Sequence, residues 1–314
     1  NLDYEKKVFI YFALGKSFED QKKYEQSFEY IKLANNAKNT FVNKDILKKE
    51  ILKYRNVKKI FDNINFQKKN IKGLFKNKII FVLGLPRSGT TLVHQLLSSA
   101  NDTYGFGESI FLSKYFDIKI FDKNFFSKIL SKKTIEEELI RISNEIGKRY
   151  SSITNKTIFI DKMPPNFYWI GFIKLLFPNS KIIHITRNIK DNYLSIYKNL
   201  FGTPDMDWSY DEKNILRFII NYKEMMKYWK KSFGNQIYEI KYDDLVKNKI
   251  YQTKNLFKFC DLKWDEKIFD FYKTAKTIRT VSINQVKKPI YQSSVNINEK
   301  FSKFLKHLNQ LEDI

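Results

Sequence analysis

The stretch that most constrains the fold is residues 79–97, IIFVLGLPRSGTTLVHQLL. An apolar, β-branched run typical of a buried strand ends at Gly84, and a helical pattern follows a loop that ends at Thr91. Gly89 allows the backbone to turn close to a ligand, and the amides of the loop and of the first helical turn point inward. Because the positive end of the helix dipole lies beside them, these amides form a cradle for an anion.

The loop keeps the glycine spacing of the nucleoside-triphosphate loop, G-x-x-x-x-G-K-[ST], but Thr90 stands at the lysine position. That lysine would reach the β- and γ-phosphates of a triphosphate. A cation lies inside the loop instead, at Arg87. The loop therefore favours a shorter 5′-anion whose transferable group is held by Arg87, and ATP fits it poorly.

The loop sequence PRSGTT after a buried strand resembles the 5′-phosphosulfate loop of sulfotransferases that use 3′-phosphoadenosine 5′-phosphosulfate (PAPS). It looks most like the tyrosylprotein-sulfotransferase-like branch, which includes bacterial proteins that join tetratricopeptide repeats to a sulfotransferase domain. The resemblance covers about residues 76–295 through several separate motifs. It implies that PAPS is the co-substrate and that its 5′ end is held by Pro86, Arg87, Ser88, Gly89, Thr90 and Thr91.

A second motif occupies residues 182–195, IIHITRNIKDNYLS. A strand ends before Arg187, and Asp191 is expected to cap the helix that carries Ser195. Arg187 and Ser195 then converge from a strand end and a helix start, which suits the binding of one phosphate. The motif resembles the family's 3′-phosphate site, R-N-P-x-D-x-x-x-S, with Ile189 at the proline position, and implies that role for both residues.

Two further motifs resemble the same family. Residues 240–245, IKYDDL, are similar to its strand-ending Y-E-D-L signature, which implies that Tyr242 lies against the adenine. Residues 282–289, SINQVKKP, are similar to the S-x-D-Q-V-x-K-P loop of the tyrosylprotein enzymes. That loop implies cofactor contacts from Ser282 and Lys288 and a place for Ser282 beside the sulfuryl group. After it the match fades, because the family's Gly-Arg-Trp segment does not follow.

Three residues are candidates for the chemistry. Glu108, in YGFGES, follows a predicted second strand near the mouth of the loop and matches the glutamate that acts as base in the tyrosylprotein enzymes. His94, on the helix after the loop, is the competing base, because other sulfotransferase branches use histidine. Lys162, in IDKMPP, aligns with the family's lysine before proline, which implies contact with the bridging oxygen and stabilisation of the leaving phosphate.

No metal is expected in this chemistry, because side chains and amides can supply the positive charge. The histidines, His94, His184 and His307, are far apart in the sequence, and Cys260 is the one cysteine. This distribution shows no metal-ligand spacing.

Short apolar runs alternate with long helical patterns along the rest of the chain. The runs are residues 78–83, 157–160, 181–186 and 236–242, and the helical patterns include 135–149 and 215–232. Buried strands that alternate with helices are typical of a parallel sheet of βαβ units. The sequence therefore predicts a P-loop-like α/β three-layer sandwich.

An α-helical, repeat-like segment is predicted before this sandwich. Residues 8–41 have the small and large residues of a tetratricopeptide repeat, with Gly15 and Ala34 where two helices need close contact, although Asn39 replaces the closing proline. An ordinary helical hairpin fits the pattern equally well. We expect a repeat-like helical segment over residues 1–75, which could bind a protein partner, and a sulfotransferase domain over residues 76–314.

The chain has 57 Lys+Arg against 34 Asp+Glu, a formal net charge of +23. The basic residues are scattered and no nucleic-acid-binding signature accompanies them, so the charge favours an anionic ligand rather than nucleic acid. No stretch approaches the roughly 20 apolar residues of a membrane span. One cysteine and no secretory signal predict a cytoplasmic protein, but the chain begins with Asn1, so a missing leader stays open.

Two other functions fit parts of the sequence. A P-loop kinase could use Asp161, at the end of IFID, as its Walker B residue. A non-catalytic scaffold is the other. Four residues retained together argue against it, namely Arg87, Lys162, Arg187 and Ser195. The acceptor stays open among a tyrosine peptide, a saccharide hydroxyl and a lipid-linked sugar. Trp208 could stack on a ring of the acceptor or belong to the core.

Overall fold

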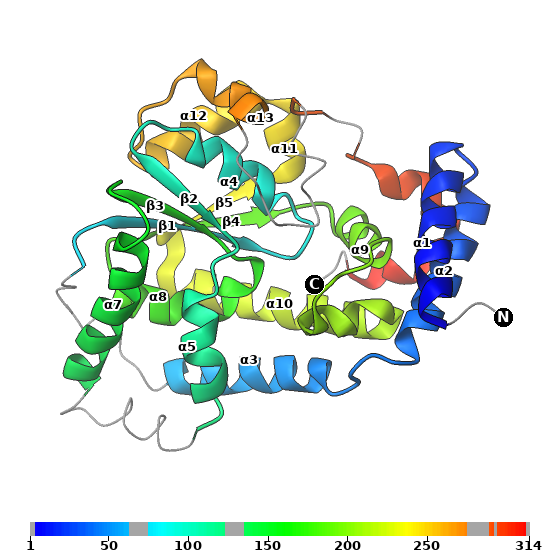
Figure 1. Cartoon of the computed structure of the whole chain (residues 1–314), viewed down its shortest axis with the longest axis horizontal. Coiled ribbons are helices and arrows are strands. Elements are labelled where there is room, and N and C mark those ends of the chain that lie inside the picture. The colour runs from blue at the N-terminus through cyan, green and yellow to red at the C-terminus, as the bar shows by residue number, and fades with distance from the viewer. Residues whose placement is uncertain (1–3, 63–74, 123–134, 275–288, 292–293, 312–314) are drawn as a thin grey trace. The chain divides into compact units, whose positions relative to one another are not determined.

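The computed structural model describes residues 4–62, 75–122, 135–274, 289–291 and 294–311 (Figure 1). The chain divides into two compact units that are each discontinuous in sequence. The first consists of Asn1–Leu52, Arg187–Glu224 and Gln292–Ile314, and the second of Lys53–Thr186 and Met225–Tyr291. The proposed domain division at residues 75 and 76 stays a prediction. Ser282 and Lys288 lie outside the described residues.

The second unit is built on a five-stranded sheet in the order β2-β3-β1-β4-β5, with every pairing parallel. The strands are β1 (Lys78–Gly84), β2 (Thr103–Gly107), β3 (Ile158–Lys162), β4 (Lys181–Thr186) and β5 (Ile237–Lys241). Four of them coincide closely with the predicted apolar runs. The α/β fold with a central parallel sheet is therefore confirmed.

Helices cover both faces of this sheet, which gives three layers (Figure 1). The helices within this unit are α4 (Thr90–Ser98), α5 (Phe111–Lys119), α7 (Ile135–Ser151), α8 (Ile170–Leu176), α11 (Tyr242–Lys247), α12 (Lys249–Phe259) and α13 (Phe271–Thr274). One face is buried under α4 and α12, where Val82 and Ile185 join Val93 and Phe257 in one core. On the other face, the ring of Phe159 in β3 stacks on Tyr150 of α7 at 5.7 Å.

The described helical turns of the second unit also include three short 3-10 segments. They are η2 (Pro164–Trp169), η4 (Gly234–Gln236) and η5 (Glu266–Asp270). Two long helices, α3 (Ile46–Asp62) and α10 (Glu212–Phe233), contribute residues to both units. No helix in the described part of the chain combines the length and the apolar character that a membrane span requires.

The first unit is helical and begins with the predicted hairpin, α1 (Tyr4–Asp20) and α2 (Tyr24–Asn39). The two helices touch at Gly15, where a Cβ atom would lie 2.8 Å from Cγ1 of Ile31. Ser27 Oγ of α2 donates a 2.7 Å hydrogen bond to the Gly15 carbonyl. The hairpin and its close contact are confirmed, whereas its assignment as a tetratricopeptide repeat stays a prediction.

Later segments of the chain complete the first unit around this hairpin. They are α9 (Ile189–Tyr197), η3 (Pro204–Tyr210), η6 (Ile297–Phe304) and η7 (Lys306–Leu311). Phe28 of α2 stacks on Phe304 at 4.5 Å, and Asn35 donates to the carbonyl of Tyr197 at 2.9 Å. Trp208 is buried against Phe218. Of the two interpretations of Trp208, a place in the core is therefore correct.

Candidate active site

The loop between β1 and α4 has the backbone that an anion cradle needs. Arg87 has a φ of +67° and Gly89 a φ of +105°, so two loop residues adopt left-handed conformations. Such a conformation is strained for arginine and is typical of sites where a loop is held in one shape. Gly89 is the N-cap of α4 and provides no side chain to cap the first helical amides. No side chain of the N-cap residue therefore covers this end of the helix, which leaves its first amides accessible to an anion.

Ser88 adds a buried donor to the same loop. Its side chain is buried, and its Oγ has no hydrogen-bond partner among the residues that the structure describes. A buried hydroxyl without a partner costs free energy in the absence of a ligand, and native proteins rarely keep one without a reason. Together with the uncapped start of α4, this hydroxyl fits the loop for a phosphate-bearing group.

Tyr242 is brought to the loop from the far end of the sequence. It is the first residue of α11, directly after β5, and it is largely buried. A Cβ atom at Gly89 would lie 2.4 Å from the Tyr242 ring, so the ring packs against the glycine backbone. The structure thus places Tyr242 beside the anion loop, and Gly89 is the residue that leaves room for it.

Glu108 and Lys162 form an ion pair at the carboxyl edge of the sheet. Lys162 is the last residue of β3, and its fully buried ammonium donates to Oε1 of Glu108, which follows β2 and is 38% exposed. Burial lowers the pKa of Lys162, and the charge of Glu108 opposes that shift. Val82 of β1 is the strand partner of Lys162, so Lys162 lies on the strand next to the one that carries the anion loop.

An irregularity in β2 sets the position of Glu108. Gly105 pairs with Ile160, but Gly107 pairs with Asp161, so the register skips one residue between the two glycines. A β-bulge of this kind adds a residue to one strand and re-aims the side chains beyond it. Glu108, the next residue, is thereby brought level with Lys162.

His94 is buried and already engaged. Its Nε2 accepts a 3.1 Å hydrogen bond from the backbone N–H of Gly107, and the side-chain amide of Gln95 lies 3.1 Å from Nδ1. Burial, with a smaller effect from the charge of Lys162, lowers the pKa of His94 to about 3. His94 is therefore neutral at physiological pH, and its lone pair on Nε2 is used by the protein itself rather than left for a substrate proton.

Asp161 is fully buried and its carboxylate accepts from three side chains. Ser109 and Tyr150 donate hydroxyl hydrogen bonds to Oδ2, and Asn166 donates from Nδ2 to Oδ1 at 3.1 Å. Burial raises the pKa of Asp161 to about 6, although these hydrogen bonds lower it. Both carboxylate oxygens of Asp161 are used in hydrogen bonds to other side chains, so Asp161 has a structural role. This weakens its interpretation as the Walker B residue of a kinase. Within the described ranges, no group of three or more His, Cys, Asp or Glu could hold a metal ion.

The second motif is divided between the two units: residues 182–186 belong to β4 of the second unit, and Arg187 and Ser195 belong to the first. Arg187 directly follows β4 and donates to the carbonyl of Ser294, and Ser195 lies in the second turn of α9. The predicted capping role of Asp191 is wrong: the N-cap is Asn188, whose side chain accepts from two amides of the first turn. Asp191 is buried, and its carboxylate accepts from the backbone of residues 296 and 298 at 2.8 Å.

Sequence reasoning missed three residues that hold the site together. They are Ser109, Tyr150 and Asn166, which converge on Asp161. Ser109 could have been suspected because it follows Glu108, and the glycines on either side of Phe106 are a signal for the bulge. Nothing local marks the other two, since their roles depend on which strands are neighbours.

Comparison with known proteins gives a consistent result. A family model described as "Sulfotransferase family" matches residues 80–266, more than half of the chain. An uncharacterized protein of Aquifex aeolicus is 31% identical over 96% of this chain, and the chain spans 40% of that protein's length. A Caenorhabditis briggsae protein, provisionally named a protein-tyrosine sulfotransferase, is 20% identical over 61% of this chain and 68% of its own.

Two solved structures share the fold. The sulfotransferase domain from the curacin biosynthetic pathway has a TM-score of 0.51 and 16% identity, with 76% of this chain and 98% of that chain covered. The sulfotransferase domain of the Synechococcus PCC 7002 olefin synthase has a TM-score of 0.50 and 18% identity, with 74% and 90% covered. At these identities the likeness shows the fold alone.

Proposed function

The chain belongs to the sulfotransferase family, and from this premise we propose that it transfers a sulfuryl group from PAPS to a hydroxyl acceptor. The observation that carries the proposal is the contact between Glu108 and the buried ammonium of Lys162, which ends the strand next to the one that carries the anion loop. A carboxylate that is partly exposed can reach an incoming acceptor, while a buried cation can act on a leaving group.

The reaction assigns a separate task to each of these groups. The acceptor oxygen forms a bond to sulfur while the bond from sulfur to the bridging oxygen of PAPS breaks, and the nucleotide leaves with the electrons of that bond. Glu108 takes the proton of the acceptor hydroxyl as general base. Lys162 donates to the bridging oxygen, on which negative charge gathers, and Arg87 stabilises the oxygens of the transferring group.

Binding of the nucleotide is proposed to use both ends of the molecule. The loop, with its uncapped helix start and the hydroxyl of Ser88, would hold the 5′ end, and the Tyr242 ring beside Gly89 would face the adenine. Arg187 and Ser195 are proposed for the 3′-phosphate, and Ser282 and Lys288 for further contacts. These four assignments are supported by their motifs alone.

The acceptor is proposed only as a class, a hydroxyl on a peptide tyrosine or a saccharide. The name of the Caenorhabditis briggsae relative supports the inclusion of tyrosine peptides. A screen with radiolabelled PAPS against tyrosine peptides, saccharides and simple phenols would identify the acceptor, with the Glu108→Gln variant as the blank.

The role of Glu108 is tested by separating transfer from nucleotide binding. We expect Glu108→Gln to abolish transfer and to leave the affinity for adenosine 3′,5′-bisphosphate (PAP) within a few-fold, because the base acts on the acceptor. Transfer is measured with radiolabelled PAPS and PAP affinity by isothermal titration calorimetry. Asp102→Asn, at an exposed carboxyl before β2, is the matched control and should change neither quantity. A large loss of PAP affinity in Glu108→Gln would refute the assignment.

A further inference from the structure

The residues on both sides of Glu108 are each attached to a buried side chain. Before it, the N–H of Gly107 donates to Nε2 of His94 at 3.1 Å. After it, the hydroxyl of Ser109 donates to the carboxylate of Asp161. Glu108 itself is 38% exposed, and its carboxylate accepts from the buried ammonium of Lys162.

We propose that His94 and Asp161 are positioning residues, which fix the backbone on either side of Glu108 so that its carboxylate meets the acceptor hydroxyl. This inference rests on the proposed function of Glu108 as the general base. It extends that function by giving a positioning role to two buried groups that are not proposed to contact the acceptor or the nucleotide.

The glycine before Glu108 explains why such a support is needed. Gly107 has a φ of +67°, and among the described residues no atom outside its two chain neighbours lies within 4 Å of where its Cβ would be. Glycine has more backbone freedom than any other residue, so an unsupported peptide at this point would sample several directions for Glu108. The hydrogen bond to His94 removes that freedom at the amide of Gly107.

His94 is seated firmly enough to serve as a fixed acceptor. Gly105 of β2 lies against it, since a Cβ atom at Gly105 would be 2.8 Å from His94 Nε2 and 2.3 Å from the hydroxyl of Ser98. The imidazole stays neutral because it is buried, as its low pKa shows. A neutral ring keeps a lone pair on Nε2 for the Gly107 amide over the whole working pH range.

Asp161 connects the other side of Glu108 to the frame of the fold. Its carboxylate also accepts from Tyr150 of α7 and Asn166 of η2, so Ser109 is tied to three elements of the second unit. A misplacement of about 1 Å at a catalytic group can cost about 10²-fold in rate. Loss of either attachment should therefore lower kcat without weakening nucleotide binding.

Two variants of His94 separate positioning from chemistry. His94→Gln puts a carbonyl oxygen near the place of Nε2 and can still accept from Gly107, whereas His94→Leu fills the space without an acceptor. We expect kcat to fall about 10²-fold in His94→Leu and no more than about threefold in His94→Gln. The KM for PAPS and the affinity for PAP should stay within a few-fold in both variants.

Ser109→Ala provides a second and gentler variant, because Asp161 keeps two other donors. We expect about a tenfold loss of kcat with unchanged PAP affinity, in line with one lost hydrogen bond to a charged group. Circular dichroism would establish that each variant is folded before its kinetics are interpreted.

The assay uses radiolabelled PAPS with 4-nitrophenol as a simple phenolic hydroxyl, and counts label on the phenol and as free sulfate. Hydrogen exchange of the peptide that contains Gly107 is measured in parallel. Support requires that His94→Leu speeds this exchange and lowers kcat, and that His94→Gln restores both.

Other outcomes overturn the inference. If His94→Gln is as inactive as His94→Leu while the Gly107 amide stays protected, His94 acts on the substrate itself. If exchange is unchanged in His94→Leu, His94 does not hold the turn. The proposed function fails in a different way: the unsubstituted protein then transfers label to neither the phenol nor water, although the exchange result is unaffected.

Discussion

Replacement of Lys162 by methionine should make the protein more stable and inactive. The Lys162 side chain is fully buried, and removal of an ammonium from water costs several kcal/mol. Its ion-pair partner, Glu108, is 38% exposed, so solvent screens part of the attraction that would offset this cost. An apolar side chain of similar length avoids the cost. Replacement of both members of a buried pair by apolar residues is often neutral or stabilising by about 1–4 kcal/mol. Here only Lys162 is replaced, and the Glu108 carboxylate that remains is 38% exposed and stays hydrated. We expect a gain of about 0–2 kcal/mol.

Removal of the partner should have the opposite effect. Breaking a fully buried pair costs about 3–5 kcal/mol, because one charge is left uncompensated. Since Glu108 is more than one-third exposed, we discount this to about 1–2 kcal/mol for Glu108→Gln. In the Lys162→Met background the same change should cost almost nothing, so the coupling free energy between the two sites is about 1–2 kcal/mol.

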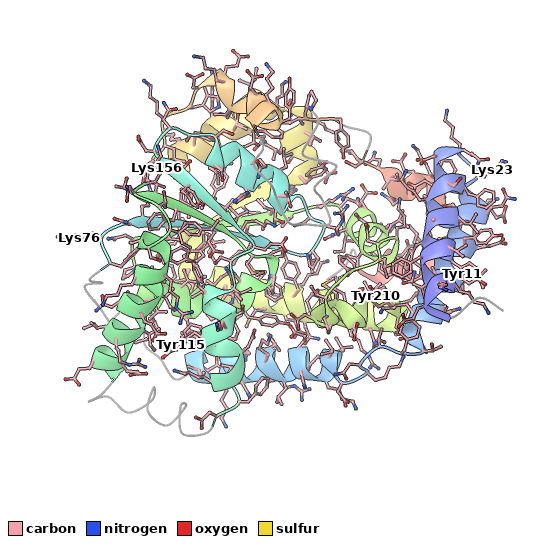
Figure 2. The ribbon with its side chains drawn as sticks, in the orientation of Figure 1. Tyr11, Lys23, Lys76, Tyr115, Lys156 and Tyr210 are labelled. Carbon is pink, nitrogen blue, oxygen red and sulfur yellow. The ribbon has the colours of Figure 1, made fainter. Side chains whose placement is uncertain are left out.

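Urea denaturation followed by tryptophan fluorescence measures the free energy of unfolding of the four proteins in this cycle. Lys156→Met is the matched control, because Lys156 is an exposed lysine just before the same strand (Figure 2). It should change stability by less than about 0.5 kcal/mol. The reasoning is refuted if Lys162→Met destabilises the protein by 3 kcal/mol or more, about the cost of a broken buried pair, or if Glu108→Gln costs as much without Lys162 as with it.

Three further outcomes follow from the geometry. Gly89→Ala should lower PAP affinity at least about tenfold in calorimetry, because a left-handed φ and a clash with Tyr242 both oppose a Cβ; unchanged affinity would contradict this. Arg187→Ala should weaken PAP about 10–100-fold and 5′-AMP far less, and equal losses would reject its 3′-phosphate role. His94→Gln should make the free energy of unfolding less sensitive to acid. The folded protein favours the neutral ring of His94, so the stability of the unsubstituted protein falls by about 1.4 kcal/mol per pH unit as the pH drops below 6.5 toward 3. Urea titrations at pH 7 and 4.5 measure this loss, and an equal loss in both proteins would contradict the prediction.

Local sequence patterns were sufficient for the strands and for the loop. The apolar run before Gly84 is a buried central strand, and the glycine spacing produces the uncapped start of α4. These features depend on neighbours along the chain, so residue type and spacing determine them. The same holds for the contact of Gly15 in the hairpin, where a small residue is needed at the crossing of two helices.

The sequence was less informative where a side chain could bind either a neighbour along the chain or a residue far away in the sequence. Asp191 and Asn188 are both suitable caps by residue type. Asn188 is the cap, and the carboxylate of Asp191 accepts from the backbone of residues 296 and 298. That segment is 105 residues away in the sequence, and no local signal points to it. The contact of the Tyr242 ring with Gly89 is of the same kind, since it requires the order of the strands.

The motif around Glu108 indicated a candidate base, but the strand pattern gave no sign of the ion pair with Lys162. The register between β2 and β3 explains this difference. In a regular parallel pair, Gly107 would stand opposite Lys162 and Glu108 would lie beyond the end of β3. The bulge between Gly105 and Gly107 moves the pairing by one residue, so that Gly107 meets Asp161 and Glu108 reaches Lys162. Because successive strand residues point to opposite faces of the sheet, a shift of one residue changes which side chain of β3 the residue after Gly107 can reach. The bulge, set by two glycines and supported by buried polar groups, is therefore what makes an ion pair of two residues that lie 54 positions apart.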